Sequence, residues 1–107
     1  MAWAAEGGNM LTLPIKKKWF DMIRSGEKEE EYRGITDYYG TRFRNVFGYA
    51  AYWGDPHKIR LRNGYSSNSP SIIVTCTLSK KQGKPEWGAE PGKRYFVLTI
   101  LEVEDET

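Results

Sequence analysis

The chain has few of the residues that build metal centres and disulfide frameworks. Its 107 residues include one cysteine, Cys76, and one histidine, His57. A single cysteine excludes an internal disulfide and a cysteine-rich zinc site, and one histidine leaves a metal centre short of its commonest ligand. No apolar run approaches the ~20 residues that a membrane-spanning helix requires. We therefore expect no bound metal, no cofactor and no association with a membrane.

The first nine residues contain neither the basic segment nor the apolar segment of a secretory signal. Together with the lone thiol, this predicts a cytoplasmic protein. Residues 1–9 are expected to form a flexible, glycine-rich lead-in. Residues 10–107 are expected to form a single domain, because domains of about 100 residues are common. The protein is assumed to be a monomer.

Charge is distributed unevenly along the chain, although the formal net charge is only +2. Residues 42–64 hold five Lys or Arg against one acidic residue, and residues 78–94 hold five against two. Residues 102–106, near the end of the chain, are mostly acidic. A cationic face that also carries aromatic rings suits nucleic acid, because phosphates are anionic and bases stack on rings. An ordinary solvated surface is the alternative.

The spacing of apolar residues predicts five strands and two short helices. Trp19, Phe20 and Ile23 recur at helical spacing, whereas Ile59 and Leu61 alternate with basic residues as in a half-buried strand. The expected strands cover residues 10–15, 28–33, 58–64, 71–78 and 95–103, and the expected helices cover residues 16–25 and 35–44.

Two stretches are harder to assign. Residues 28–33 are rich in Glu and Lys, which favour a helix, but they follow Gly26, and we interpret them as a strand. Residues 46–52 are ambiguous, and residues 79–94 are expected to be a connection punctuated by glycine and proline.

The mixed order of elements predicts an α+β fold, mainly β. About five strands would form a small closed or partly closed sheet, with two or more short helices beside it.

One short stretch is more specific than the rest. Gly26, Lys28, Glu31 and Arg33 have the spacing G-x-K-x-x-E-x-R and follow directly after an amphipathic helix. In this motif and in its order of elements the chain resembles the ASCH family, which is related in fold to the PUA RNA-binding domains.

The resemblance extends over residues 10–104. The stretches 13–21, 62–65 and 85–92 are similar to those of a phage- and prophage-associated branch of small ASCH proteins. The resemblance implies a PUA-like mixed β-barrel with helices beside it and a cleft lined by the motif. It also implies RNA or a modified nucleoside as the partner.

Some members of the family are small amidohydrolases that remove an acetyl group from acetylated cytidine, and others are reported as ribonucleases. Three residues after the lysine, those amidohydrolases carry a threonine nucleophile, whereas this chain has Glu31. A carboxylate assists water but does not readily form the same acyl intermediate. This difference weakens the amidohydrolase interpretation.

The chemistry of the motif residues suits a nucleotide. Lys28 offers a compact cation for a phosphate, or a base if burial lowers its pKa. Glu31 is suited to accept from the amino group of a base or to activate water, and Arg33 offers a planar fork for a phosphate or a base edge. We expect all three to converge on one cleft. The alternative is that they pair with one another and brace the mouth of the barrel.

Other candidates lie outside the motif. Lys16 precedes the first helix and is suited to donate to a phosphate, while Arg62 and Asn63 end a strand at the expected rim of the barrel. Tyr65 and Trp87 lie in loops, where an aromatic ring is suited to stack on a base. Turn chemistry for Asn63 and loop anchoring for Trp87 are the structural alternatives.

Two functions from different classes follow from these residues. The favoured one is a module that binds RNA or a nucleotide in a cationic cleft. The other is a small hydrolase of the same fold, an amidohydrolase or a ribonuclease, with Lys28 and Glu31 as its acid/base pair. A role in protein interaction is a third, less favoured interpretation.

Overall fold

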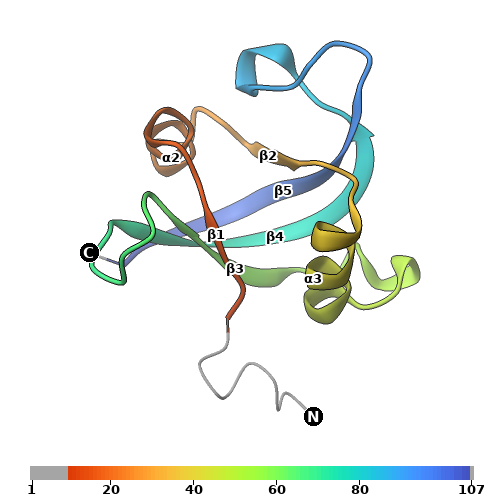
Figure 1. The fold of residues 1–107 in the computed structure, drawn as a ribbon, viewed down its shortest axis with the longest axis horizontal. Helices are drawn as coiled ribbons and strands as arrows, with labels where there is room; N and C mark the ends of the chain where they lie inside the picture. Colours follow the sequence, from red (N-terminus) through yellow and green to blue (C-terminus); the bar gives the residue numbers. More distant parts are fainter. Residues whose placement is uncertain (1–9, 107) are drawn as a thin grey trace.

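Five strands form one curved mixed sheet in the order β1-β3-β4-β5-β2 (Figure 1). The computed structural model describes residues 10–106, so the expected lead-in over residues 1–9 lies outside the described residues. The elements, in chain order, are β1 (Thr12–Pro14), α2 (Lys17–Arg24), β2 (Glu30–Arg33), α3 (Asp37–Phe47), the 3-10 turn η1 (Ala50–Tyr52), β3 (His57–Arg62), β4 (Ser71–Gln82), the 3-10 turn η2 (Pro85–Trp87) and β5 (Arg94–Asp105).

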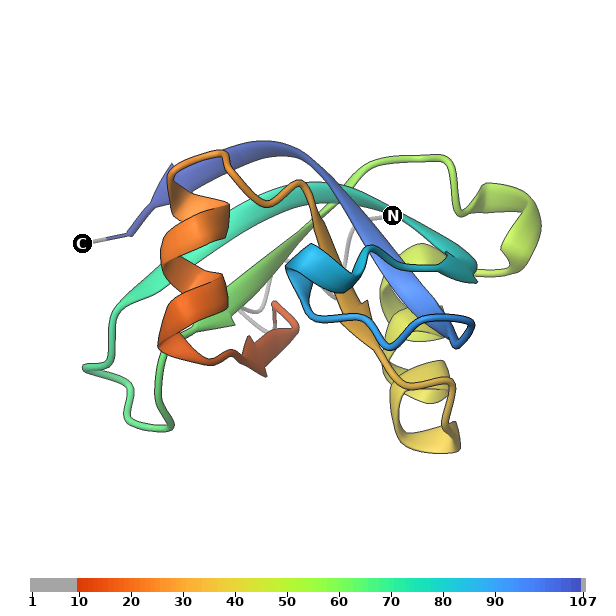
Figure 2. The same ribbon diagram turned by 90° about the horizontal axis from the view of Figure 1, so that it is seen from above.

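The sheet is a half-barrel whose two edges are the short strands β1 and β2. β1 pairs with β3 in parallel, and all other neighbours are antiparallel. β4 and β5 form a long hairpin that arches over the molecule in Figure 2, and a register shift between Thr75 and Cys76 marks a bulge in it. Bulges increase local twist and bend a strand. The fold is therefore α+β and mainly β, as the sequence predicts.

Both predicted helices are present. In α2, Phe20 and Ile23 are buried, and Gly26 follows the helix with a φ of +86°. Such a φ favours glycine, because a Cβ atom is disfavoured in the left-handed region. The start of α3 is stabilised by Thr36, whose hydroxyl accepts a hydrogen bond from the amide of Tyr39 at 3.2 Å.

Most element boundaries differ from the predictions by a few residues, and three of these differences concern the site or the core. α3 continues to Phe47 rather than ending at residue 44, because the buried rings of Phe43 and Phe47 extend its apolar stripe by one turn. β4 continues to Gln82 rather than ending at residue 78, because its charged last residues keep pairing with β5. His57 begins β3, one residue before the predicted start, and its ring meets that of Phe47 edge-on.

The hydrophobic core fills the concave side of the half-barrel. It takes Phe20 and Ile23 from α2, Phe43 and Phe47 from α3, and inward side chains from every strand except β2. Cys76 belongs to this core and is completely buried, which raises the pKa of its thiol to about 12. Within residues 10–106, no helix has the length and apolar character needed to cross a membrane.

Candidate functional site

The two edges of the half-barrel meet through the side chain of Arg33. Its Nη2 atom donates to the carbonyl oxygen of Pro14, the last residue of β1, at 2.7 Å. The amide of Ile15 belongs to the same peptide group and donates to the carbonyl of Arg62 at 2.9 Å. A trans peptide directs its C=O and N–H in opposite directions. One peptide group therefore links β2, through Arg33, to β3.

The turn after α2 places Lys28 beneath the helix. The amide of Gly26 donates to the carbonyl of Ile23 at 3.1 Å, and the amide of Lys28 donates to that of Met22 at 2.9 Å. The chain thus folds back under the last turn of the helix before β2 begins. As a result, the ammonium of Lys28 lies 5.0 Å from the ring centroid of Trp19 and 4.7 Å from that of Tyr32.

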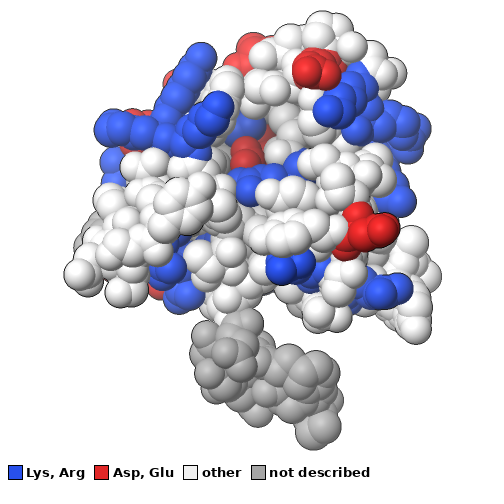
Figure 3. Space-filling view, in the orientation of Figure 1, with Lys and Arg blue, Asp and Glu red and all other residues white. Residues whose placement is uncertain are grey.

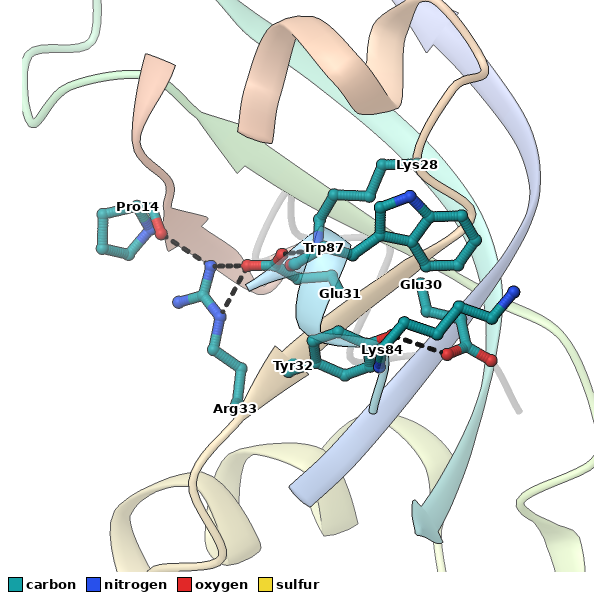
Figure 4. A network of polar contacts seen from close by, with 8 residues as sticks. All are labelled: Pro14, Lys28, Glu30, Glu31, Tyr32, Arg33, Lys84 and Trp87. Carbon is teal, nitrogen blue, oxygen red and sulfur yellow. Dashed lines mark hydrogen bonds and ion pairs between the residues drawn. The ribbon is translucent and has the colours of Figure 1, made fainter. Parts of the chain in front are cut away.

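Lys28, Glu31 and Arg33 form a linear array of charges, shown in Figure 4. The carboxylate of Glu31 lies between the two cations: Oε1 is 3.3 Å from the Lys28 ammonium, and Oε2 accepts from Nη2 and Nε of Arg33 at 2.7 and 3.0 Å. Backbone carbonyls complete the array at its ends, because Lys28 donates to Trp87 at 2.6 Å and Arg33 donates to Pro14. Two cations and one anion give this charge array a net charge of +1.

The charge array is almost completely withdrawn from water. The side chains of Lys28, Glu31 and Arg33 are 1%, 7% and 10% exposed. Burial lowers the pKa of Lys28, and the adjacent Glu31 carboxylate offsets this only in part. Burial also acts to lower the pKa of Arg33, but Glu31 and the Tyr39 hydroxyl outweigh it and raise that pKa. The Arg33 guanidinium therefore stays charged at any physiological pH.

The loop that contains η2 is fixed at several points. The amide of Lys84 donates to the Tyr32 hydroxyl at 2.9 Å, and the amide of Glu90 donates to the Tyr95 hydroxyl at 3.0 Å. The carbonyl of Trp87 accepts from Lys28, as described above. Gly83 allows the loop to cross Tyr32 closely, because a Cβ atom there would lie 2.6 Å from the tyrosine ring. The loop is thus held directly against the charge array.

The surface is hollowed between α2 and the loop that contains η2, and charged atoms of both signs lie on the floor of this hollow (Figure 3). A lysine–tryptophan pair stands on each side of the charge array. The Lys18 ammonium lies 4.6 Å from the Trp19 ring centroid, and the Lys84 ammonium lies 4.4 Å from the Trp87 ring centroid. Both lysines are exposed. The hollow therefore combines positive charge with flat rings.

Of the residues predicted for the site, Lys28, Glu31, Arg33 and Trp87 are brought together. All three motif side chains also pair with one another, as the structural alternative expects. The Lys28 ammonium is enclosed by protein, so a phosphate reaches it only if the loop that contains η2 moves. Trp87 contributes its carbonyl to the array, while its ring is half-buried beside Lys84.

The remaining predicted residues lie at the end of β3 or on the surface. The Asn63 side chain donates to the carbonyl of Ile15 at 3.0 Å and so anchors the end of β1. Arg62 is half-buried, and its Nε atom has no hydrogen-bond partner within the described part of the chain. Lys16 is exposed just before α2, and Tyr65 is 91% exposed in the loop that follows β3.

Sequence reasoning did not identify several groups that complete the site. The carbonyls of Pro14 and Trp87 carry no sequence signal, because every residue has a carbonyl group. The hydroxyl of Tyr39, which accepts from Arg33 at 3.2 Å, carries no signal of this role in the sequence. Trp19 and Tyr32 were interpreted as parts of a helix and a strand, although their rings enclose Lys28.

Comparison with known proteins adds no relative, because no family model, curated protein or solved structure matches the chain. The described residues also contain no group of three His, Cys, Asp or Glu side chains placed to hold a metal ion. The chemistry of the site therefore has to be inferred from its geometry.

Proposed function

We propose that the chain binds RNA and seats one nucleotide in the hollow over Glu31 and Arg33. The observation that carries the proposal is the net charge of +1 on the buried charge array, between two exposed lysines that lie over tryptophan rings. A cationic groove with stacking rings is the general design of sites for single-stranded nucleic acid. The ligand would supply the anion that the array lacks.

Each group has a separate role in this proposal. Arg33 and Glu31 form the floor, where a carboxylate accepts from the amino group of a base and a guanidinium donates to a base edge or a phosphate. Lys28 fixes the position of Glu31 and of the loop through the Trp87 carbonyl. Lys18 and Lys84 lie where the phosphates of the flanking nucleotides would pass.

The spacing of Gly26, Lys28, Glu31 and Arg33 supports the same assignment. It is the feature in which the chain resembles the ASCH family, and we propose that the protein is a small ASCH domain with a PUA-like half-barrel. On this assignment a modified nucleoside, rather than an unmodified one, is a further candidate for the bound residue.

The test is a fluorescence anisotropy titration with short labelled single-stranded RNA, with duplex RNA as the comparison. We expect binding that weakens as salt is added, with a slope of about 0.7 in log K per phosphate contact. The double variant Lys18→Gln/Lys84→Gln should bind more weakly and lose part of this slope. Lys58→Gln is the matched control, because Lys58 is a half-exposed lysine of β3 that pairs with Glu104.

Two results would contradict the proposal. One is the absence of binding to either RNA at low salt. The other is an equal loss of RNA affinity in the control and in the double variant, which would mean that binding depends only on the overall charge of the protein.

A hydrolase is the second candidate, because one specific observation favours it. Lys28 has a lowered pKa and lies 3.3 Å from the carboxylate of Glu31, and such buried pairs are typical of proton transfer in active sites. The test offers N-acetylated cytidine and RNA to the wild type, Lys28→Met and Glu31→Gln. Product from the wild type alone would establish an enzyme, whereas equal product from all three would exclude this site.

A further inference from the structure

A second concave site lies on the other side of α3 from the charge array. It is a cavity of about 340 Å³ between α3, η1 and the ends of β4 and β5. This volume is at the lower end of the range for small-molecule sites. None of Lys28, Glu31 and Arg33 lines it. Figure 1 shows α3 and η1 beside each other, away from α2 and the loop that contains η2.

The lining of this cavity has an excess of positive charge. Arg44 of α3 and Lys80 of β4 line it, and neither has an acidic partner within residues 10–106. Asp37 is the one carboxylate among the lining residues. The neighbouring Lys81, by contrast, pairs with Glu30 at 2.8 Å. The cavity therefore offers two cations whose charge is not neutralised by a paired carboxylate.

Aromatic rings form the apolar part of the same cavity. The Lys80 ammonium lies 5.8 Å from the ring centroid of Trp53 and 5.3 Å from that of Phe96. The indole N–H of Trp53 donates to the carbonyl of Gly48 at 3.0 Å, which fixes the orientation of the ring. Gly40 has no side chain, which leaves space beside Phe96. A Cβ atom at this position would lie 3.9 Å from the Phe96 ring, so a larger side chain would occupy part of the cavity.

We propose that this cavity binds a nucleoside monophosphate. Its lining matches the three parts of such a ligand: the half-buried ring of Trp53, which meets the buried ring of Phe96 edge-on, suits the flat base, and Arg44 and Lys80 suit the phosphate. The Asp37 carboxylate and the Thr41 hydroxyl suit the donors of the ribose or base. A simple anion would leave the rings and Asp37 without a partner, and a neutral nucleoside would leave both cations without one. The site is separate from the hollow proposed for RNA and does not depend on that function.

The test is a titration of the whole chain with adenosine and uridine 5′-monophosphates, followed by ¹H–¹⁵N NMR. The reporter is the indole resonance of Trp53, assigned with Trp53→Phe. We expect this resonance to shift, and the nucleotides to bind about tenfold or more tightly than uridine or inorganic phosphate. Arg44→Gln and Lys80→Gln should each weaken binding about tenfold, the usual effect of losing one charged hydrogen bond.

Arg42→Gln is the matched control, because Arg42 lies on the same helix but stacks on Tyr38, 3.5 Å from its ring centroid and outside the cavity. It should bind like the wild type. The proposal is overturned if the Trp53 resonance does not move, if phosphate alone binds as tightly, or if Arg42→Gln weakens binding equally. Loss of nucleotide binding in Lys18→Gln/Lys84→Gln, with Arg44→Gln unaffected, would assign the nucleotide to the hollow and overturn this inference alone.

Discussion

Replacing Glu31 by glutamine tests the charge array most directly. Glu31 is the one anion between two buried cations, with side chains 1% and 10% exposed for Lys28 and Arg33. Glutamine preserves the shape of the side chain but leaves both cations without a counter-charge. Removing one partner from a buried ion pair costs about 3–5 kcal/mol of the free energy of unfolding. For a chain of this size, that lowers the melting temperature by about 12 °C or more.

Lys28→Met should behave differently although it removes a charge from the same array. Glu31 and Arg33 remain paired, and the two opposite charges leave the buried array with no net charge. The methionine fills much of the space of the lysine stem. The remaining penalty is the Trp87 carbonyl, which loses its donor and costs about 1–3 kcal/mol. In the double variant Lys28→Met/Glu31→Gln, only Arg33 lacks a counter-charge, so the double variant should be more stable than Glu31→Gln alone.

Urea unfolding followed by circular dichroism measures all three differences. Asp21→Asn is the control, because it breaks a surface pair with Lys17 whose partners are 40% and 78% exposed, and such pairs contribute little. The reasoning is refuted if Lys28→Met destabilises the protein as much as Glu31→Gln does, or if the double variant is less stable than both single variants.

Three further predictions follow from single contacts. The pKa of Lys28 is lower in the folded protein than in the unfolded chain, so the unfolded chain keeps the lysine proton to higher pH. The contribution of Lys28 to the free energy of unfolding therefore rises as pH increases toward 10.5. The difference in unfolding free energy between wild type and Lys28→Met, measured across alkaline pH, should show this rise. Cys76 is buried and the pKa of its thiol is about 12, so at pH 8 it should react with a thiol reagent only after denaturant is added. Gly83→Ala places a Cβ atom 2.6 Å from the Tyr32 ring and 2.7 Å from Ala89, and should lower the free energy of unfolding by about 1–3 kcal/mol in a chemical melt, whereas Gly54→Ala, with nothing within 4 Å, is the control.

Local signals were enough to predict most of the elements. The helical spacing of Phe20 and Ile23 and the glycine at position 26 each act within one turn, and each is present in the structure. Local signals do not predict the last residues of β4 or the last turn of α3, because long-range contacts determine them. The charged end of β4 is ordered by its pairing with β5, and Phe47 is held by the core.

The candidate site could be predicted only in part. The spacing of Lys28, Glu31 and Arg33 indicated which side chains belong together. It did not indicate that Lys28 is enclosed, because the enclosing groups come from α2, β2 and a loop some 60 positions later in the chain. The cavity lined by Arg44 and Lys80 had no local signal at all, since its walls come from four separate elements.

The bond between Arg33 and the Pro14 carbonyl also bears on self-association. β1 and β2 are edge strands, and unpaired edge groups are templates on which strands of other molecules add. The guanidinium occupies the carbonyl of Pro14, at the end of β1, with a bulky, charged side chain that cannot continue a ladder. The residue that closes the half-barrel thus also blocks a docking strand, and we expect that losing it makes the protein prone to aggregate before it unfolds.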